Sequence, residues 1–431
     1  MFSHTLSRRH PSARLQATKG GRIDGHQRTQ CGHTFASALT FEEERYLSRC
    51  RAIEPPPGLP NGQFDVIGEV RTIWRIFRGA APGEVLVVFS NRGLLKPELL
   101  ATILFRLLPS RRRLRVVVYG DLWQPSFGAQ ALVERAAVRL LVPAVARYVC
   151  STRSAAELVQ EFWRISPSKL TVLPYYFDWR SMVDLAASSD DGYVFSGGST
   201  ARDFGPVLQR ARERPDVQFV INTTRLGKGD VPRNVELMSE RTDGYVKLME
   251  RAAVVLLPLR TDYRRGTGTL TLLLAASLKK PIIVTPAFGV AEYLTDGEHA
   301  LFVDGSVEQY GAALDHVADL MHASEVAAMV ERAHQHVTKH FTLACHLDGL
   351  LRVVDEAAEM HSLTEVRLGS GTSTALRRHK RGLSDSCGAA QAARLRFDQF
   401  FSSIRSRHPP SGAAGSGTTG SGTVARSSTN S

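Results

Sequence analysis

The chain has 431 residues, a hydrophobic fraction of 43% and a formal net charge of +12. This length suffices for two domains with cores of their own. No run of residues approaches the roughly 20 apolar positions that a bilayer-spanning helix needs. The five cysteines lie far apart without a Cys-x-x-Cys pair, so neither a disulfide framework nor a cysteine zinc site is indicated, and a reducing cytoplasm is the expected location.

The positive charge is concentrated at the two ends of the chain. Lys and Arg exceed Asp and Glu by 4 in residues 1–60 and by 7 in residues 361–431, which leaves a net charge of +1 for residues 61–360. This distribution argues against nucleic acid as a partner of the folded body. Residues 1–60 are predicted to be a disordered extension without a signal peptide, and 363–431 a disordered, basic, Gly/Ser-rich tail.

The first predicted domain, residues 61–187, alternates apolar strands and helices. Strands are expected at 84–90, 114–120, 147–151 and 170–174, with helices at 96–108, 129–141 and 153–163. The strands are apolar without polar alternation, which is typical of a parallel sheet covered on both faces. The helix at 96–108 and the arginines at 111–113 have two interpretations. They are part of the core with a solvated edge, or they form a surface that docks on an anionic membrane.

The second predicted domain, residues 190–342, follows a short polar linker and repeats this organisation. Strands are expected at 193–196, 217–221, 235–238, 254–259 and 282–285, and helices at 203–213, 244–253, 270–278, 307–322 and 324–338, before a C-terminal helix at 343–362. The predicted fold is therefore α/β, with two Rossmann-like parallel-sheet domains facing a cleft. Ligands of such sheets bind at the carboxyl ends of the strands.

A loop of glycine and threonine joins the strand at 254–259 to the helix at 270–278. The free N–H groups and the positive dipole end of a helix N-terminus favour phosphate. Glycines allow close approach of the backbone, and threonine hydroxyls add donors. We predict that a phosphorylated small molecule binds to Gly266, Thr267, Gly268 and Thr269, next to Arg264 and Arg265.

Several motifs resemble those of family 4-like glycosyltransferases with the GT-B fold. Residues 273–283, Leu-Leu-Ala-Ala-Ser-Leu-Lys-Lys-Pro-Ile-Ile, resemble the family's Leu-Glu-Ala-Met-Ala-x-Gly-Lys-Pro-Val-Ile core. Residues 289–297, Gly-Val-Ala-Glu-Tyr-Leu-Thr-Asp-Gly, are similar to its Gly-x-x-Glu-Ile/Tyr-Val-x-Asp-Gly run. Weaker likenesses occur at 196–204 and 172–178. The resemblance covers roughly residues 63–360 and is strongest in the second half.

This resemblance implies a retaining glycosyltransferase that moves a sugar from a nucleotide diphosphate-sugar to an acceptor, without a metal or other cofactor. The donor would lie on the second domain, and a glycan or lipid-linked acceptor on the first. A bacterial role in cell-surface or secondary glycan synthesis is expected, in the cytoplasm or at the inner face of the membrane. The implied catalytic residues are Arg202, Glu292 and Asp121, and the implied donor-binding residues are Gly197, Gly198, Arg225, Arg265 and 266–269.

Each of the three catalytic candidates also has a structural interpretation. Arg202 would neutralise phosphate, or it could pair with Asp203 at the start of a helix. Glu292 would accept hydrogen bonds from sugar or ribose hydroxyls, or it could cap its own short helix. Asp121 follows a strand and would steer an acceptor hydroxyl, or it could belong to a turn.

The chain departs from the family at its paired glutamates. Gly266 and Leu274 occupy the two positions of the family's Glu-x7-Glu motif, so a GT-B-like protein that binds a nucleotide or a partner without turnover is the second hypothesis. A sugar epimerase or phosphorylase is a third. No histidine lies between His33 and His299, which argues against a histidine base or a histidine metal site in the first domain.

Overall fold

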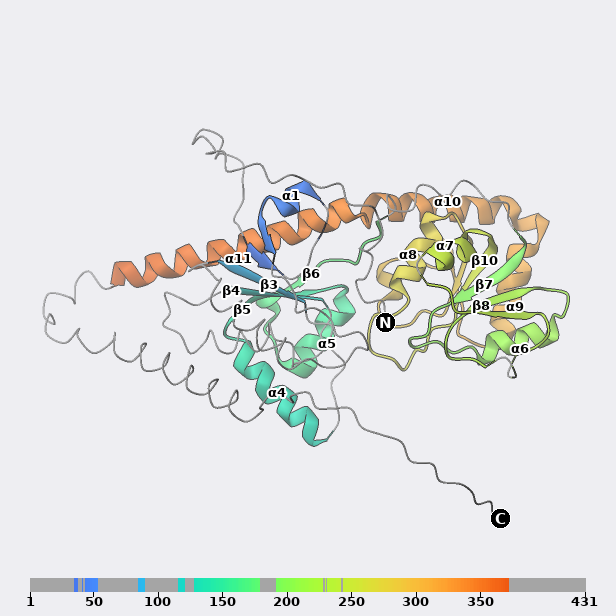
Figure 1. The fold of residues 1–431 in the computed structure, drawn as a ribbon, viewed down its shortest axis with the longest axis horizontal. Helices are drawn as coiled ribbons and strands as arrows, with labels where there is room; N and C mark the ends of the chain where they lie inside the picture. The colour runs from blue at the N-terminus through green and yellow to red at the C-terminus, as the bar shows by residue number, and fades with distance from the viewer. Residues whose placement is uncertain are drawn as a thin grey trace, which may run out of the picture. The chain divides into compact units, whose positions relative to one another are not determined.

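The computed structural model describes residues 35–37, 41, 43–52, 84–89, 115–120, 128–178, 191–227, 229, 231–241 and 243–371, the last eleven of them as backbone only. Within these residues the strands form two six-stranded sheets, parallel throughout. Helices accompany both sheets (Figure 1). The predicted α/β fold with two Rossmann-like parallel sheets is confirmed. We call the parts built on the two sheets the first lobe and the second lobe.

The sheet of the first lobe includes two strands that the sequence did not predict. Its order is β2 (Cys50–Ala52), β1 (Phe35–Ser37), β3 (Val85–Phe89), β4 (Arg115–Tyr119), β5 (Val145–Cys150) and β6 (Leu170–Val172). The prediction of a disordered extension over 1–60 is therefore wrong for β1, β2 and the intervening α1 (Glu44–Leu47). Three-residue strands are too short for a hydrophobic period, and their burial comes from neighbours distant in the sequence.

Two helices of the first lobe have the predicted bounds. They are α4 (Ala129–Leu141) and α5 (Arg153–Trp163), and a single 3₁₀ turn, η2 (Pro167–Lys169), follows α5. Thr152 caps α5 because its side chain accepts a hydrogen bond from the Ala155 N–H at 3.0 Å. The helix predicted at 96–108 lies outside the described residues.

The sheet of the second lobe has the strand order of a doubly wound nucleotide-binding fold. The order is β12 (Leu301–Phe302), β11 (Ile282–Val284), β10 (Ala252–Leu257), β7 (Tyr193–Gly197), β8 (Phe219–Asn222) and β9 (Val235–Met238). The chain builds outward from β7 to β9 and then restarts on the other side of β7 with β10. The direction of winding therefore reverses between β7 and β10, where such folds bind ligands.

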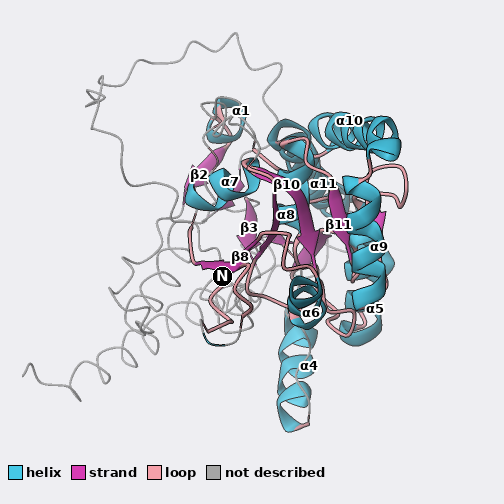
Figure 2. Cartoon of the chain, turned by 90° about the vertical axis from the view of Figure 1, so that its right-hand side faces the viewer, coloured by secondary structure: helices cyan, strands magenta, loops and turns pink. Residues whose placement is uncertain are grey.

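Helices cover both faces of the second sheet (Figure 2). One face packs against α6 (Gly205–Glu213) and α9 (Val307–Ala318). The other packs against α7 (Asp243–Glu250), α8 (Thr269–Ser277) and α10 (Ala323–His340). The helix predicted at 244–253 ends earlier, because Ala252 pairs with Tyr193 and begins β10.

The C-terminal helix α11 (Leu343–Gly371) returns the chain to the first lobe. Leu347, Leu350 and Val354 are buried with Phe35 and other residues of the first sheet, and the helix runs alongside that sheet in Figure 1. The helix begins at the predicted residue and extends beyond the predicted end at 362. Among the helices of the described part of the chain, none is long and apolar enough to cross a membrane.

Helix α11 also carries a histidine into the core of the first lobe. His346 is 3% exposed, its Nε2 lies 2.8 Å from the Tyr119 hydroxyl, and its Nδ1 lies 2.8 Å from the Pro174 carbonyl oxygen. A carbonyl can only accept, so Nδ1 carries the proton and the Tyr119 hydroxyl donates to Nε2. Although residues 34–298 contain no histidine, α11 therefore places one in this lobe. Both ring nitrogens of His346 are engaged in hydrogen bonds.

We expect His346 to make the protein less stable in mild acid. Burial lowers the pKa of His346 to about 4, whereas an unfolded chain titrates near 6.5. As the pH falls from about 6.5 towards 4, the unfolded state takes up a proton that the folded state refuses, so stability decreases across this window. The loss between pH 7 and pH 5 is about 2 kcal/mol.

Urea unfolding of the wild type and of His346→Phe at pH 7 and pH 5 measures this effect. The phenylalanine variant should be less stable at pH 7 but should lose about 2 kcal/mol less than the wild type on acidification. His340→Gln, at an exposed position of α10, should keep the pH dependence of the wild type. Equal pH dependence in the wild type and in His346→Phe would contradict the assignment.

Candidate functional site

The loops that follow β7 and β10 meet at the reversal of the second sheet. Arg202 and Leu259 form an antiparallel bridge. The Asp203 N–H donates to the Pro258 carbonyl at 2.8 Å, and the Arg260 N–H donates to the Ala201 carbonyl at 3.1 Å. Backbone hydrogen bonds therefore join the two loops, and their residues lie where a doubly wound sheet binds its ligand.

Arg202 lies between these two loops with its guanidinium turned inward. Its Nε donates to the Gly197 carbonyl and its Nη1 to the Thr200 carbonyl, both at 3.0 Å. No described residue accepts a hydrogen bond from Nη2. Burial lowers the pKa of Arg202. The predicted alternative of an Arg202–Asp203 pair is wrong, because Asp203 accepts from the Gly205 N–H at the start of α6.

The glycines around Arg202 make room for its side chain. A Cβ on Gly198, whose φ is +109°, would lie 2.8 Å from Nη2, and one on Gly268 would lie 3.4 Å from both Nη atoms. A Cβ on Gly197 would lie 2.6 Å from the Tyr245 hydroxyl. Gly197 is the last residue of β7 rather than part of a turn. Packing against Arg202 and Tyr245 thus accounts for glycine at 197 and 198, and their role towards a donor stays a prediction.

The N-terminus of α8 is open next to this guanidinium. Gly268 is its N-cap residue with φ +78°, a conformation that favours glycine, and no side chain caps the helix. The N–H groups of Thr267, Gly268 and Thr269 have no acceptor among the described residues. Unsatisfied N–H groups, the helix dipole and the neighbouring half-buried guanidinium of Arg202 together favour an anion at this end of α8.

A cavity of about 350 Å³ adjoins Arg202 at the carboxyl ends of β7, β10, β11 and β12. This volume is in the range of small-molecule pockets. Its lining is mostly polar; residues 266–269 do not belong to it, and the side chains that do include Arg202, Asp203, Arg260, Asp262, Thr285 and Tyr310. Arg202 and Leu259 therefore border both the cavity and Gly268 at the start of α8, and Arg202 is the cation of the two.

Two further predicted cations differ in how they are held. The Arg225 Nε donates to the Ser199 carbonyl at 3.1 Å, which ties the loop after β8 to the loop after β7. Arg265 is half-buried, and its side chain has no hydrogen-bond partner or ion pair among the described residues. By contrast, Arg264 pairs with Glu161 of α5 at 3.2 Å and lies 5.5 Å from the Phe162 ring centroid. Of the two adjacent arginines, Arg265 is the one available to a ligand.

Glu292 occupies a position that neither sequence interpretation anticipated. It ends the short 3₁₀ helix η5 (Val290–Glu292) of the second lobe. Its Oε2 accepts from the Arg153 N–H at 2.5 Å, and its Oε1 accepts from the Ser154 N–H at 2.9 Å and from the Ser154 hydroxyl at 2.8 Å. The carboxylate therefore caps α5 of the first lobe, and its partners are not ligand hydroxyls. A cap contributed by a distant segment leaves no local signal in the sequence.

We expect Glu292→Ala to destabilise the protein in the absence of any ligand. The change removes three hydrogen bonds to a charged acceptor and a favourable charge at a helix N-terminus, a loss of about 2 kcal/mol. The midpoint of urea unfolding measures it, with Glu298→Ala as a control because the Glu298 side chain is 56% exposed. Unchanged stability together with weaker nucleotide binding would instead support the predicted role towards a donor.

The remaining positions singled out in the sequence are Asp121, the two positions of the missing glutamates, and Lys279. Asp121 lies outside the described residues. Leu274 is 5% exposed in the core beneath α8, and Gly266 is half-buried. Lys279, which replaces the usual glycine of the family motif, has φ +55°, so the backbone keeps the left-handed turn while Lys279 pairs with Glu331 of α10 at 2.7 Å.

Solved structures of other proteins share the fold of this chain. The chain is similar to a glycosyltransferase from Rickettsia africae, with 11% sequence identity, a TM-score of 0.54 and coverage of 72% of this chain and 84% of the other. It is also similar to Anabaena HepE in complex with UDP-glucose, with 13% identity, a TM-score of 0.51 and coverage of 74% and 87%. The fold is that of the GT-B glycosyltransferases.

A family match is confined to part of the second lobe. Residues 201–319 match the family described as glycosyl transferases group 1, and this segment holds Arg202, residues 266–269 and Glu292. The second lobe thus carries a segment similar to the group 1 glycosyltransferases, in agreement with the resemblance of its motifs, and the chain has the GT-B fold. A comparison with curated proteins gives no match.

Proposed function

We propose that the protein is a retaining glycosyltransferase that takes its sugar from a nucleoside diphosphate-sugar. The observation that carries this proposal is the pairing of a half-buried guanidinium, Arg202, with the open N-terminus of α8. Both lie at the reversal of the second sheet, and together they offer a fixed cation and unoccupied N–H groups to a diphosphate. The complex of Anabaena HepE with UDP-glucose makes a UDP-sugar the first donor to test.

The proposed chemistry depends on stabilising the leaving diphosphate. As the bond between the sugar and the diphosphate breaks, positive charge develops on the sugar ring and negative charge on the phosphate oxygens. Groups already oriented towards those oxygens lower the barrier without further reorganisation. Arg202 and the N–H groups of residues 267–269 would supply this field, and Arg225 and Arg265 would add positive charge. In this proposal no metal ion is needed at the diphosphate.

The acceptor is proposed to bind against the first lobe. A glycan or a lipid-linked acceptor of bacterial cell-surface or secondary glycan synthesis would suit an enzyme of the cytoplasm or of the inner membrane face. Its hydroxyl would attack on the same face of the sugar that the diphosphate leaves, as retention requires. Asp121, which follows β4 in the sequence, remains our candidate for steering that hydroxyl.

Helix α4 supports contact with an anionic membrane. Its outward face carries Leu132, Val133 and Leu140, which are 67%, 68% and 52% exposed, beside the exposed Arg135 and Arg139. A solvent-facing helix is normally polar on its outer face, whereas apolar residues flanked by arginines suit a bilayer interface. We expect the protein to sediment with vesicles containing anionic lipid, and Leu132→Glu/Leu140→Glu to abolish this. Equal sedimentation of the two proteins would contradict the assignment.

Donor turnover and donor binding together test the proposal. The purified full chain is incubated with UDP-glucose and, separately, with GDP-mannose, and release of the nucleoside diphosphate is followed while calorimetry measures UDP and GDP binding. Release of diphosphate, with the sugar passing to water, supports the transferase, and NMR spectra recorded before the freed sugar mutarotates then report whether its anomeric configuration is retained. Nucleotide binding without release of diphosphate from any donor of a wider panel would favour the non-catalytic alternative. The absence of both family glutamates is the reason for considering that alternative. Absence of binding would overturn the donor site.

A further inference from the structure

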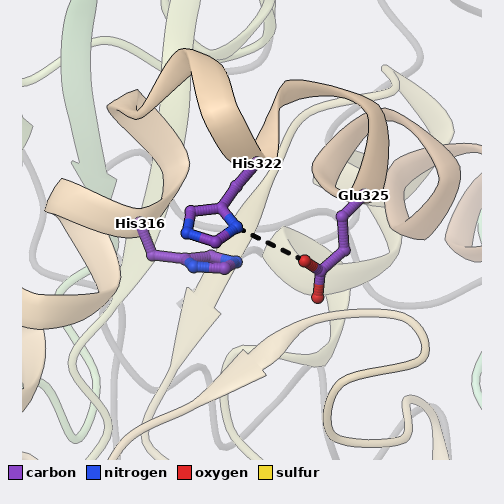
Figure 3. A group of neighbouring side chains, drawn as sticks. All are labelled: His316, His322 and Glu325. Atoms are coloured by element: carbon purple, nitrogen blue, oxygen red, sulfur yellow. Dashed lines mark ion pairs between the residues drawn. The ribbon is translucent and has the colours of Figure 1, made fainter.

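The corner between α9 and α10 gathers side chains that the proposed transferase chemistry does not use. His316 lies in the last turn of α9, His322 ends the 3₁₀ turn η6 (Leu320–His322), and Glu325 lies in the first turn of α10. Figure 3 shows these three side chains on one side of the corner. Their potential ligand atoms all lie within 4.8 Å of one another.

The imidazoles of this corner, like that of the exposed His340, have no hydrogen bond to another described residue. His299, His334, His336 and His346 each bond through a ring nitrogen to a backbone or side-chain group. Among the described residues, no hydrogen bond engages His316 or His322, whose rings stack with centroids 4.2 Å apart. Their nitrogens therefore remain available as ligands.

From this geometry we infer that His316, His322 and Glu325 form a binding site for a divalent transition-metal ion. The His322 Nδ1 lies 3.6 Å from Glu325 Oε2. Two ligands bonded tetrahedrally at zinc distances are about 3.4 Å apart, so this pair is already near ligating separation. The His322 and Glu325 side chains are 42% and 67% exposed, so they can adjust around an ion.

The chemistry of the ligands selects the class of ion. Two imidazoles and one carboxylate suit Zn²⁺, Ni²⁺ or Cu²⁺ and not Ca²⁺ or Mg²⁺, which prefer oxygen ligands. Asp319 faces the other side of the ring, with its Oδ2 3.8 Å from His322 Nε2, within ion-pair range but longer than a hydrogen bond. Asp319 is itself held by accepting from the Met321 N–H at 2.9 Å. A carboxylate on the far nitrogen orients a ligating imidazole and fixes its tautomer.

The site is separate from the proposed donor site. Tyr310, near the start of α9, lines the cavity beside Arg202, whereas His316 lies near the end of the same helix, about 9 Å further along its axis. His322 and Glu325 also fall outside residues 201–319, which match the glycosyltransferase family. An ion here would join the end of α9 to the start of α10 and stabilise the second lobe without contacting the donor.

Zinc titration of the full chain, without an affinity tag and after treatment with a chelator, tests the inference. We expect one saturable equivalent by calorimetry and a rise in melting temperature that the chelator reverses. His316→Ala and His322→Ala should each weaken binding at least about 10-fold, and Asp319→Asn about 10-fold through loss of ring orientation. Glu325→Gln, at an exposed position, provides a ligand variant with little risk to folding and should also weaken binding.

Two controls make the outcome specific. His340→Ala removes an exposed histidine of α10 outside the corner and should bind zinc as the wild type does. UDP binding should be the same in all these variants, so failure of the metal site and failure of the donor site are distinguishable. Absence of a saturable zinc equivalent, or equal zinc affinity in the wild type and in both histidine variants, would overturn the inference.

Discussion

Replacing Arg202 with methionine should reduce donor turnover by about 10²- to 10³-fold, the usual effect of removing one positioned donor from a developing anion. Methionine keeps much of the length of the side chain but provides neither charge nor hydrogen bonds. Affinity for UDP should fall as well, because the guanidinium adjoins both the cavity and the α8 N-terminus. Arg202→Lys should recover little, since an ammonium group cannot reproduce the planar fork that reaches two carbonyls and an anion together.

Arg202 also holds the loop after β7, so stability must be measured beside activity. Loss of its bonds to Gly197 and Thr200 should cost about 1–3 kcal/mol, and assays belong well below the melting temperature of the variant. Arg214→Met is the matched control: Arg214 pairs with Asp216 and Asp315 at the surface, and its loss should leave turnover unchanged. A folded Arg202→Met protein with wild-type UDP affinity would show that the guanidinium is only a structural clamp.

Restoring the family carboxylate at position 274 should destabilise the protein rather than improve donor binding. Leu274 is 5% exposed and packs in the core of the second lobe with Leu273 and Ala275. A glutamate there would place an unpaired carboxylate among apolar side chains, at a cost of about 3 kcal/mol or more. The urea midpoint of Leu274→Glu should fall accordingly, and Leu274→Met should change stability by less than about 1.5 kcal/mol.

The same substitution elsewhere on α8 provides a sharper comparison. Leu270 lies in the first turn of the helix and is 43% exposed, so Leu270→Glu should be nearly neutral for stability and should gain from the helix dipole. The difference in the free energy of unfolding between Leu274→Glu and Leu270→Glu separates the effect of burial from the effect of helix propensity. A stable Leu274→Glu protein that binds UDP-glucose more tightly than the wild type would mean that position 274 faces the ligand after all.

Local patterns in the sequence were sufficient for the elements that carry their own signals. Apolar periodicity placed α5 at the correct residues, and continuous apolar runs identified β7, β8, β10 and β11 of the second sheet, whereas the two-residue strand β12 was not predicted. The open loop before α8 was also predictable, because glycine, threonine and a following apolar helix are adjacent in the chain. These features depend on neighbours within a few residues.

Contacts between distant segments account for what the sequence did not reveal. β1 and β2 are strands only because β3 and α11 cover them. The same holds for Glu292, whose partners in α5 precede it by nearly 140 residues, and for His346, which α11 brings to Tyr119. Pairing at such separations depends on the tertiary fold and not on periodicity or spacing.

The return of α11 to the first sheet means that the two lobes are not independent pieces of the chain. A recombinant fragment that stops in the linker near residue 190 would lack Leu347, Leu350 and Val354, and Phe35 and Val117 would face water. Such a fragment should aggregate. During synthesis on the ribosome, the first lobe emerges before α11 has been made. Its core can therefore be completed only after the second lobe and α11 have been synthesised.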